Sequence, residues 1–334
     1  MEESENSALD HITDTVGDLV TGVPAPIRKN FFKAFGQLCT AAVDIPVAKL
    51  QSRADEIRAE SKARIRIIEE QGEQISKQLK VPQEYIYKAG EKFASKVVKE
   101  QINLDEIGMH AANNLRNEQF DEKSKETTAE INDDWLNEFE NYAKLKSSDE
   151  MKMVFGKILS GEIMQPGAFS IRTVRLISQL DNKAAQLFQI LCSQAISINI
   201  GTHIIDARVA SLGGNAASNA LSNYGLSFGN LNILQEYGLI ISDYNSWMKY
   251  APCIANEKNQ VSAFLNFNGT DYGLIPTDKE KYDKTLKISG VALTKSGKEL
   301  LNIIPKKKIK KYHQAFVEFL DSEHLKLKKV NNSG

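Results

Sequence analysis

The sequence predicts a mainly α-helical protein with an N-terminal helical arm, a central helical bundle and a C-terminal winged-helix-like α+β region. Apolar residues recur at steps of three and four over most of the first 200 residues, as they do along one face of a helix. After about residue 200, glycine, asparagine and serine become frequent and short β-prone runs follow. The length of 334 residues is too great for one typical domain and fits about two.

The composition is that of an ordinary folded protein. Hydrophobic residues make up 42% of the chain and charged residues 25%, which excludes disorder throughout. Lys and Arg number 42 against 43 Asp and Glu, so no overall basic field marks a nucleic-acid binder. Cys39, Cys192 and Cys253 lie far apart, which excludes a disulfide scaffold and a CxxC zinc or redox motif.

We expect three parts along the chain. Residues 1–80 hold an amphipathic segment and a long charged helix, 81–200 form the bundle, and 201–330 form the winged-helix-like region with a basic last helix. The charged stretch 49–80 is rich in good helix formers and is expected to be a solvated helix with a narrow contact stripe. Its apolar residues do not sustain a heptad, so it is weak evidence for a stable coiled-coil dimer. The highly charged stretch 116–132 is expected to be a linker.

The segment 23–48 carries the candidate contact residues of the arm. Its large apolar side chains recur at helical spacing, with cations among them. Such a helix docks on the protein's own core or on another subunit. The alternative is an interfacial membrane helix, whose aromatic rings enter the headgroup boundary while its cations meet anionic lipid. The candidate partner or membrane contacts are Ile27, Arg28, Lys29, Phe31, Phe32, Lys33 and Phe35.

The sequence shows neither a secretory signal nor a membrane span. The acidic N-terminus lacks the positive region and apolar core that a secretory signal needs. No stretch reaches the ~18 uninterrupted apolar residues that cross a bilayer. We therefore expect a cytoplasmic protein, with peripheral attachment to the inner membrane as the alternative for the segment 23–48.

Capping residues mark the starts of helices in the expected bundle. Asp133 or Asp134 can cap the helix that follows it. Ser147 to Glu150 is typical of a capping box, and Ser170 and Asp181 precede two further amphipathic segments. Short amphipathic helices in close succession are typical of a compact bundle.

The C-terminal part has the element order of a winged-helix module. Two helices, a short strand, a longer β excursion and a final capped helix follow one another. The β excursion, about residues 239–293, is expected to be an enlarged wing with half-buried strands near 261–267 and 286–293. The candidate recognition helix, 227–237, carries no Lys or Arg, which is a poor footprint for DNA.

A run of lysines opens the expected last helix. As phosphate contacts, they would give the winged-helix-like region affinity for nucleic acid; the alternative is a solvated first turn without a ligand. Because the recognition helix lacks cations, we expect this region to contact protein rather than to read a DNA sequence. The candidate phosphate contacts are Lys306, Lys307, Lys308, Lys310 and Lys311.

The motifs of common enzymes are missing. The stretch 290–298 has too many residues between its glycines for a P-loop, and Glu299 stands where that loop needs a hydroxyl. The Rossmann and nucleophile-elbow patterns are missing as well. The five histidines show no HExxH spacing, and Cys192 lies on the apolar side of its helix, which is typical of a buried thiol. We therefore predict no catalytic, cofactor or metal site and no enzymatic activity.

Several blocks of the chain resemble a known family. They are residues 134–136, 156–163, 166–173, 184–188 and 293–300. They resemble a bacterial family catalogued as domain of unknown function 2806, and the resemblance covers roughly residues 85–320. Phe155-Gly156 departs from the family pattern, which has a Trp and a small or polar residue there. The resemblance implies no catalytic residues, because the family has no settled activity.

One further candidate site lies in the blocks that carry this resemblance. In the structural interpretation, Pro166-Gly167 breaks a helix, Phe169 packs against the turn, and Glu162 pairs with an arginine across it. In the functional interpretation, polar residues around the turn bind a ligand or partner. These candidate residues are Glu162, Ser170, Arg172 and Thr173.

Together these observations favour a non-enzymatic interaction or regulatory protein. We expect it to self-associate as a homo-oligomer or to bind a protein partner, through the helical arm and the winged-helix-like region. One alternative is a membrane-associated effector of a bacterial stress or phage-defence system that acts through residues 23–48. The other is a DNA-binding regulator, whose partner is nucleic acid.

Overall fold

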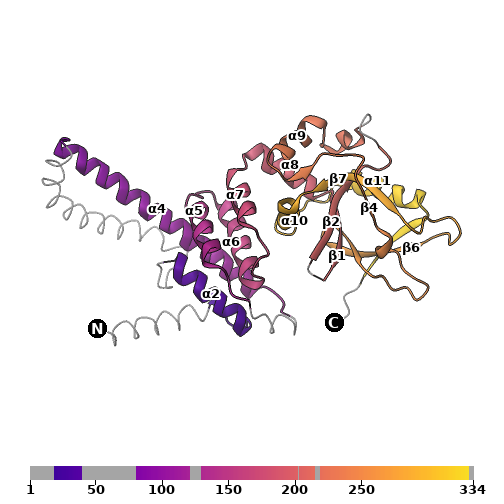
Figure 1. Ribbon diagram of the computed structural model, residues 1–334, viewed down its shortest axis with the longest axis horizontal. Coiled ribbons are helices and arrows are strands. Elements are labelled where there is room, and N and C mark those ends of the chain that lie inside the picture. The colour runs from indigo at the N-terminus through magenta and orange to yellow at the C-terminus, as the bar shows by residue number, and fades with distance from the viewer. Residues whose placement is uncertain (1–18, 40–79, 121–128, 202, 215–218, 331–334) are drawn as a thin grey trace. The chain divides into compact units, whose positions relative to one another are not determined.

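The computed structural model describes residues 19–39, 80–120, 129–201, 203–214 and 219–330. The chain divides into two compact units, Met1–Ile171 and Arg172–Gly334, each with its own core (Figure 1). Most of the expected charged helix 49–80, residues 40–48 of the segment 23–48 and residues 121–128 of the expected linker lie outside the described residues.

The first unit is built from helices that pack on one another (Figure 1). Two of these helices meet at a glycine, Gly156, which faces His110 of the other helix. A Cβ added to Gly156 would lie 2.4 Å from the Cβ of His110. Only a residue without a side chain therefore allows this approach. Trp135 stacks on Phe139 at 5.0 Å between ring centroids, and both rings are buried. The helices are α2 (Ala25–Leu38), α4 (Gln83–Arg116), α5 (Asp133–Ala143) and α6 (Asp149–Met164).

Side-chain caps begin several of the helices, as the sequence predicts. Asp181 caps its helix by accepting a hydrogen bond from the backbone N–H of Ala184 at 2.7 Å. Two caps lie one residue away from the predicted position. Asn132 rather than Asp133 or Asp134 begins α5, because its side chain accepts from the third residue beyond it. For the same reason Ser148, rather than Ser147, begins α6.

The second unit is built around an antiparallel sheet. Within the described residues this sheet has eight strands in the order β3-β7-β2-β1-β5-β6-β8, with β4 paired to β7. The strands are β1 (Ile196–Ile200), β2 (His203–Ala210), β3 (Ile240–Ile241), β4 (Trp247–Lys249), β5 (Phe264–Phe267), β6 (Thr270–Pro276), β7 (Lys287–Leu293) and β8 (Leu325–Lys329).

Helices and two short 3-10 turns complete the second unit. On α11, Tyr312, Phe316 and Leu320 are buried. The ring of Phe316 meets that of Phe267 on β5 edge-on, at 5.1 Å between centroids. The Tyr312 hydroxyl donates a hydrogen bond to the Ala210 carbonyl on β2, at 3.1 Å. These elements are α7 (Ile171–Gln179), α8 (Asn182–Cys192), η3 (Ala220–Tyr224), α9 (Phe228–Glu236), η4 (Ala251–Cys253), α10 (Lys295–Leu301) and α11 (Lys310–Ser322).

The predicted fold class is wrong, because the chain is a mixed α+β protein rather than a mainly α one. The β excursion 239–293 is no wing: it supplies β3, β4, β5, β6 and β7 to the large sheet. The strands β1, β2 and β8 were not predicted. Their positions depend on pairing between distant segments, such as β1 with β5 and β6 with β8, and periodicity within one segment cannot show that pairing. None of the described helices is both long and apolar enough to cross a membrane.

Candidate functional site

The structure buries the apolar face of α2 inside the first unit. The exposed fractions of Ile27 and Phe31 are 1% each, that of Phe35 is 6%, and Phe32 is half-buried. The helix packs on α4, α5 and α6. The face predicted to meet a partner or a membrane is therefore occupied by the protein's own core.

The polar residues of α2 also bind within the first unit. Lys29 forms an ion pair with Glu130, and Lys33 Nζ lies 2.7 Å from Asp133 Oδ1, whereas Arg28 is exposed. The Lys29 ammonium lowers the pKa of Glu130 by hydrogen bonding. The buried amide of Asn30 donates to two backbone carbonyls and accepts from a backbone N–H, at 3.0–3.3 Å. Two of the predicted membrane-facing cations are thus paired with nearby carboxylates.

The motif turn has a structural role in the first unit. Glu162 is 2% exposed, and its carboxylate accepts hydrogen bonds from the N–H groups of Gly167 at 2.6 Å and Phe169 at 2.9 Å. The indole N–H of Trp135 donates to the carbonyl of Phe169 at 2.7 Å. Gly167 has a φ of +89°, which favours glycine. These bonds hold the turn after α6 in one conformation.

The other candidate residues of this motif lie near residue 171, where the first unit ends in the sequence. Ser170 directly precedes α7 and is half-buried. Arg172 and Thr173 belong to the second unit. Arg172 is exposed beside Gly238, while buried Thr173 donates a hydrogen bond to the carboxylate of Glu299 on α10.

The basic run lies at the start of α11. The helix begins at Lys310, so Lys306, Lys307 and Lys308 precede it instead of forming its first turn. The backbone N–H of Lys307 donates to the Ser193 hydroxyl at 3.0 Å, which fixes this segment beside the end of α8. Lys306 is half-buried, whereas the lysines at 307, 308, 310 and 311 are exposed.

Lysines of β8 lie beside this run. A two-residue turn joins α11 to β8, and the two elements pack together, so the start of α11 and the end of β8 lie at the same end of the sheet. The thirteen residues of α11 span about 20 Å and the five residues of β8 about 16 Å, so the strand runs back along most of the helix. The backbone N–H of Val330 donates to the Asp271 carbonyl at 3.0 Å. Burial lowers the pKa of Lys306, whereas Cys192 and the carboxylate of Asp271 oppose that shift.

We call these side chains the lysine cluster: Lys306, Lys307, Lys308, Lys310, Lys311, Lys328 and Lys329. Residues 306–329 contain eight lysines and three acidic residues, although the whole chain has a net charge of -1. Lys311 Nζ lies 5.9 Å from the centre of the Tyr224 ring. The amino-acid sequence by itself indicates only the first five members. The alternation Leu-Lys-Leu-Lys at 325–328 was the available sign of a strand; it places Lys326 and Lys328 on one face, while Lys329 follows on the other.

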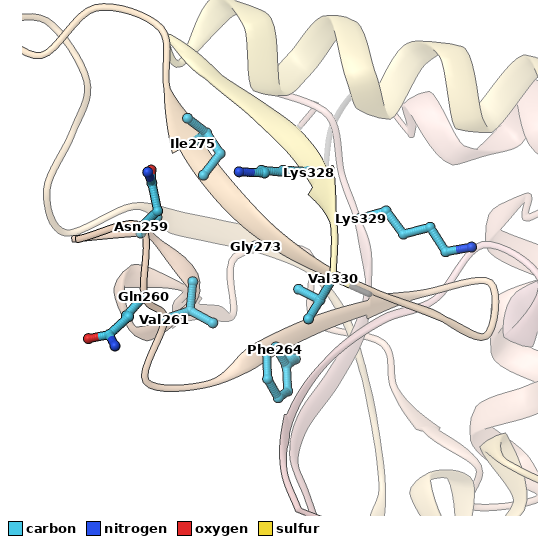
Figure 2. A pocket seen from close by; sticks show the side chains of 10 residues that line it. Asn259, Gln260, Val261, Phe264, Gly273, Ile275, Lys328, Lys329 and Val330 are labelled. Carbon is cyan, nitrogen blue, oxygen red and sulfur yellow. The ribbon is translucent and has the colours of Figure 1, made fainter. Parts of the chain in front are cut away.

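A pocket of about 440 Å³ opens beside the lysine cluster (Figure 2). Two members of the cluster, Lys328 and Lys329, line it. Figure 2 shows the side chain of Lys328 extending towards Ile275, while that of Lys329 extends away from the other labelled side chains. The remaining lining residues are Ala255, Asn259, Gln260, Val261, Phe264, Gly273, Ile275 and Val330.

The described residues include no group of three or more His, Cys, Asp or Glu side chains that could hold a metal ion. Cys192 is buried, as the sequence predicted, and burial raises the pKa of its thiol. Burial also raises the pKa of the Cys253 thiol to about 12. Both thiols are therefore protonated at neutral pH and poor nucleophiles.

Residues 88–317 match the model of a family described as protein of unknown function (DUF2806). The match confirms the resemblance inferred from the sequence blocks. No curated protein and no solved structure matches the chain.

Proposed function

For this chain, which belongs to the DUF2806 family of proteins of unknown function, we propose a non-enzymatic, cytoplasmic interaction protein that binds nucleic acid through the lysine cluster. The observation that carries the proposal is the meeting of two lysine-rich segments, 306–311 and 328–329, at one end of the sheet in a chain without overall positive charge. A local concentration of cations neutralises phosphates and releases their counterions.

The surroundings of the cluster favour nucleic acid over an acidic protein surface. The half-buried ring of Tyr224 lies under Lys311, so an aromatic group accompanies the cations. Bases stack on aromatic rings while lysines follow the backbone. Helix α9, the expected recognition helix, has no Lys or Arg, so the contact we propose is with the phosphate backbone and does not depend on base sequence.

Reversing the charge of Lys307 and Lys310 should weaken binding and reduce its salt dependence. We expect Lys307→Glu plus Lys310→Glu to lower affinity for a labelled oligonucleotide at least about tenfold, because two phosphate contacts are lost. The slope of log affinity against log salt should become shallower by about 1.4–1.8. Fluorescence anisotropy at several salt concentrations measures both effects.

The matched control changes the same charge elsewhere in the second unit. Lys279 and Lys284 are exposed in the loop after β6. The last residue of β6 pairs with the first residue of β8, so this loop starts at the opposite end of β8 from the cluster. Lys279→Glu plus Lys284→Glu should leave the salt dependence unchanged. Absence of binding by the unaltered protein, or equal losses in both double variants, would contradict the proposal.

A second proposed function, self-association, rests on α4. None of the described residues 83–99 is buried, and the exposed fractions of Tyr85 and Phe93 are 65% and 68%. Phe93 and Val97 lie at helical spacing in line with Leu104, which is buried in the first unit. The apolar face thus continues past the core and can pair with the same face of a second copy.

Replacing this face by charge should dissociate the oligomer. We expect Phe93→Glu plus Val97→Glu to reduce the mass measured by light scattering to that of the 37.2 kDa chain. Ser95→Glu plus Lys99→Gln makes the same change in charge on the opposite side of the helix and should leave the mass unchanged. A monomeric unaltered protein would rule out self-association.

A further inference from the structure

The pocket beside the lysine cluster is built from three neighbouring strands and one loop. Phe264 of β5, Gly273 of β6 and Lys328 of β8 lie side by side across the sheet, because Gly273 pairs with Lys328 and the β5–β6 register places Phe264 next to it. The loop 255–261 forms the remaining wall. Two lysines of the cluster thus line the pocket. Lys328 lies on the sheet face that also carries Gly273, whereas Lys329, the next residue of β8, extends to the other side.

The floor of the pocket depends on a glycine. A Cβ added to Gly273 would lie 3.1 Å from Cγ1 of Val261, which is closer than ordinary contact. A larger residue at this place would fill the space between the sheet and the loop. Phe264, Ile275 and Val261 give the pocket its apolar walls, as Figure 2 shows.

The loop presents two amide side chains at the pocket. The Asn256 side chain accepts hydrogen bonds from the N–H groups of Lys258 at 2.9 Å and Gln260 at 3.0 Å. Asn259 has a φ of +57°, a conformation that asparagine tolerates. This turn fixes the backbone that carries the Asn259 and Gln260 amides, which are exposed at the pocket. Amides donate and accept hydrogen bonds and so match the edges of nucleobases.

We propose that this pocket takes one unpaired nucleobase of a strand bound on the lysine cluster, so that the preferred ligand is single-stranded nucleic acid. The inference rests on the proposed nucleic-acid binding. A volume of about 440 Å³ lies in the range of small-molecule sites, and its combination of an aromatic ring, aliphatic walls, amides and a neighbouring ammonium suits a base followed by its phosphate. A base within a duplex is stacked and paired, and cannot enter without being extruded.

Three labelled nucleic-acid probes of equal length test this inference. The probes are a labelled single strand of mixed sequence, the same sequence as a duplex, and an abasic strand of equal length. We expect the unaltered protein to bind the mixed single strand more tightly than the other two. Phe264→Ala should weaken binding of the mixed strand about 5- to 100-fold and leave binding of the abasic strand unchanged.

A second pocket variant and a matched control keep the test independent of folding. Ile275→Trp should fill the pocket and cause the same selective loss, since Ile275 is half-buried at its wall. Phe228→Ala removes an aromatic ring that is 46% exposed on α9, outside the pocket, and should change neither affinity. Unchanged affinity for the abasic strand shows that each variant keeps the lysine cluster intact.

The outcomes separate this inference from the proposed function. Equal affinity for mixed and abasic strands, or pocket variants without effect, would overturn the base pocket while salt-dependent binding through Lys307 and Lys310 stands. Tighter binding of the duplex than of the single strand would also overturn it. If none of the three probes binds, both the pocket and the proposed function fail.

Discussion

Phe31→Ala is expected to destabilise the first unit by about 3–5 kcal/mol, because it removes a buried aromatic side chain and leaves a cavity. Phe31 is 1% exposed, and its ring lies 5.3 Å from that of Phe35 on the same helix. Urea unfolding measures the change. Trp135 lies in the first unit and Trp247 in the second, so a Trp247→Phe background makes tryptophan fluorescence report on the first unit alone.

The same variant distinguishes the core role of α2 from the membrane-associated effector. We expect the unaltered protein to stay unbound in a flotation assay with anionic vesicles, because the rings that would enter lipid are inside the unit. Gln37→Ala, at an exposed position of α2, is the matched control and should leave stability nearly unchanged. The effector hypothesis would instead gain support if the protein floated with vesicles and Phe31→Ala abolished flotation without lowering stability.

Arg208→Leu is expected to destabilise the second unit by about 3–5 kcal/mol, because it leaves Asp206 without its buried partner. Arg208 is 3% exposed, and its guanidinium binds both carboxylate oxygens of Asp206, at 2.7 and 2.9 Å. It also donates to the carbonyls of Ser246 at 3.0 Å and Ile288 at 3.1 Å. The Tyr250 hydroxyl donates to Asp206 at 3.0 Å, and burial raises the pKa of Tyr250.

A double variant tests whether the loss comes from the unpaired carboxylate. Asp206→Leu together with Arg208→Leu removes both charges, and we expect it to recover a large part of the stability lost in the single variant. Arg175→Leu, at an exposed position of α7, should change the free energy of unfolding by less than about 0.5 kcal/mol. Unfolding is followed by Trp247 fluorescence in a Trp135→Phe background. A double variant as unstable as Arg208→Leu would show that Asp206 does not cause the loss.

Local signals located several helices well. Pro82 precedes α4, Asp181 caps α8 and Thr294 caps α10, as expected, because capping involves residues three apart in the chain. Predicted strands near 261–267 and 286–293 correspond to β5, in which half-buried and buried positions alternate, and to β7, in which two consecutive buried residues interrupt the alternation. The sheet that contains them was not predicted. An alternating segment specifies a strand face, but not which other strands pair with it.

The candidate sites also include residues that come together only through contacts between distant segments. The segment 306–311 was found from its charge, whereas Lys328 and Lys329 joined it only through the turn between α11 and β8. The pocket was not predicted either, since Phe264, Gly273 and Lys328 become neighbours through sheet register. Glu162 was predicted either to pair with an arginine or to bind a ligand or partner; in the structure its carboxylate accepts two backbone hydrogen bonds within its own turn.

Amino-acid order alone specified the amphipathic helices, most of their starting residues and the excess of lysine near the C-terminus, because these properties arise from side chains a few positions apart. It left open which surface each apolar or charged face would meet. The tertiary structure shows that the aromatic face of α2 is buried in the first unit. It also shows that β8 packs on α11, so that the end of β8 lies at the same end of the sheet as the start of α11. Both arrangements depend on contacts between segments that are distant along the chain. The free energy of such contacts depends on the whole folded unit, so it cannot be judged from one segment alone.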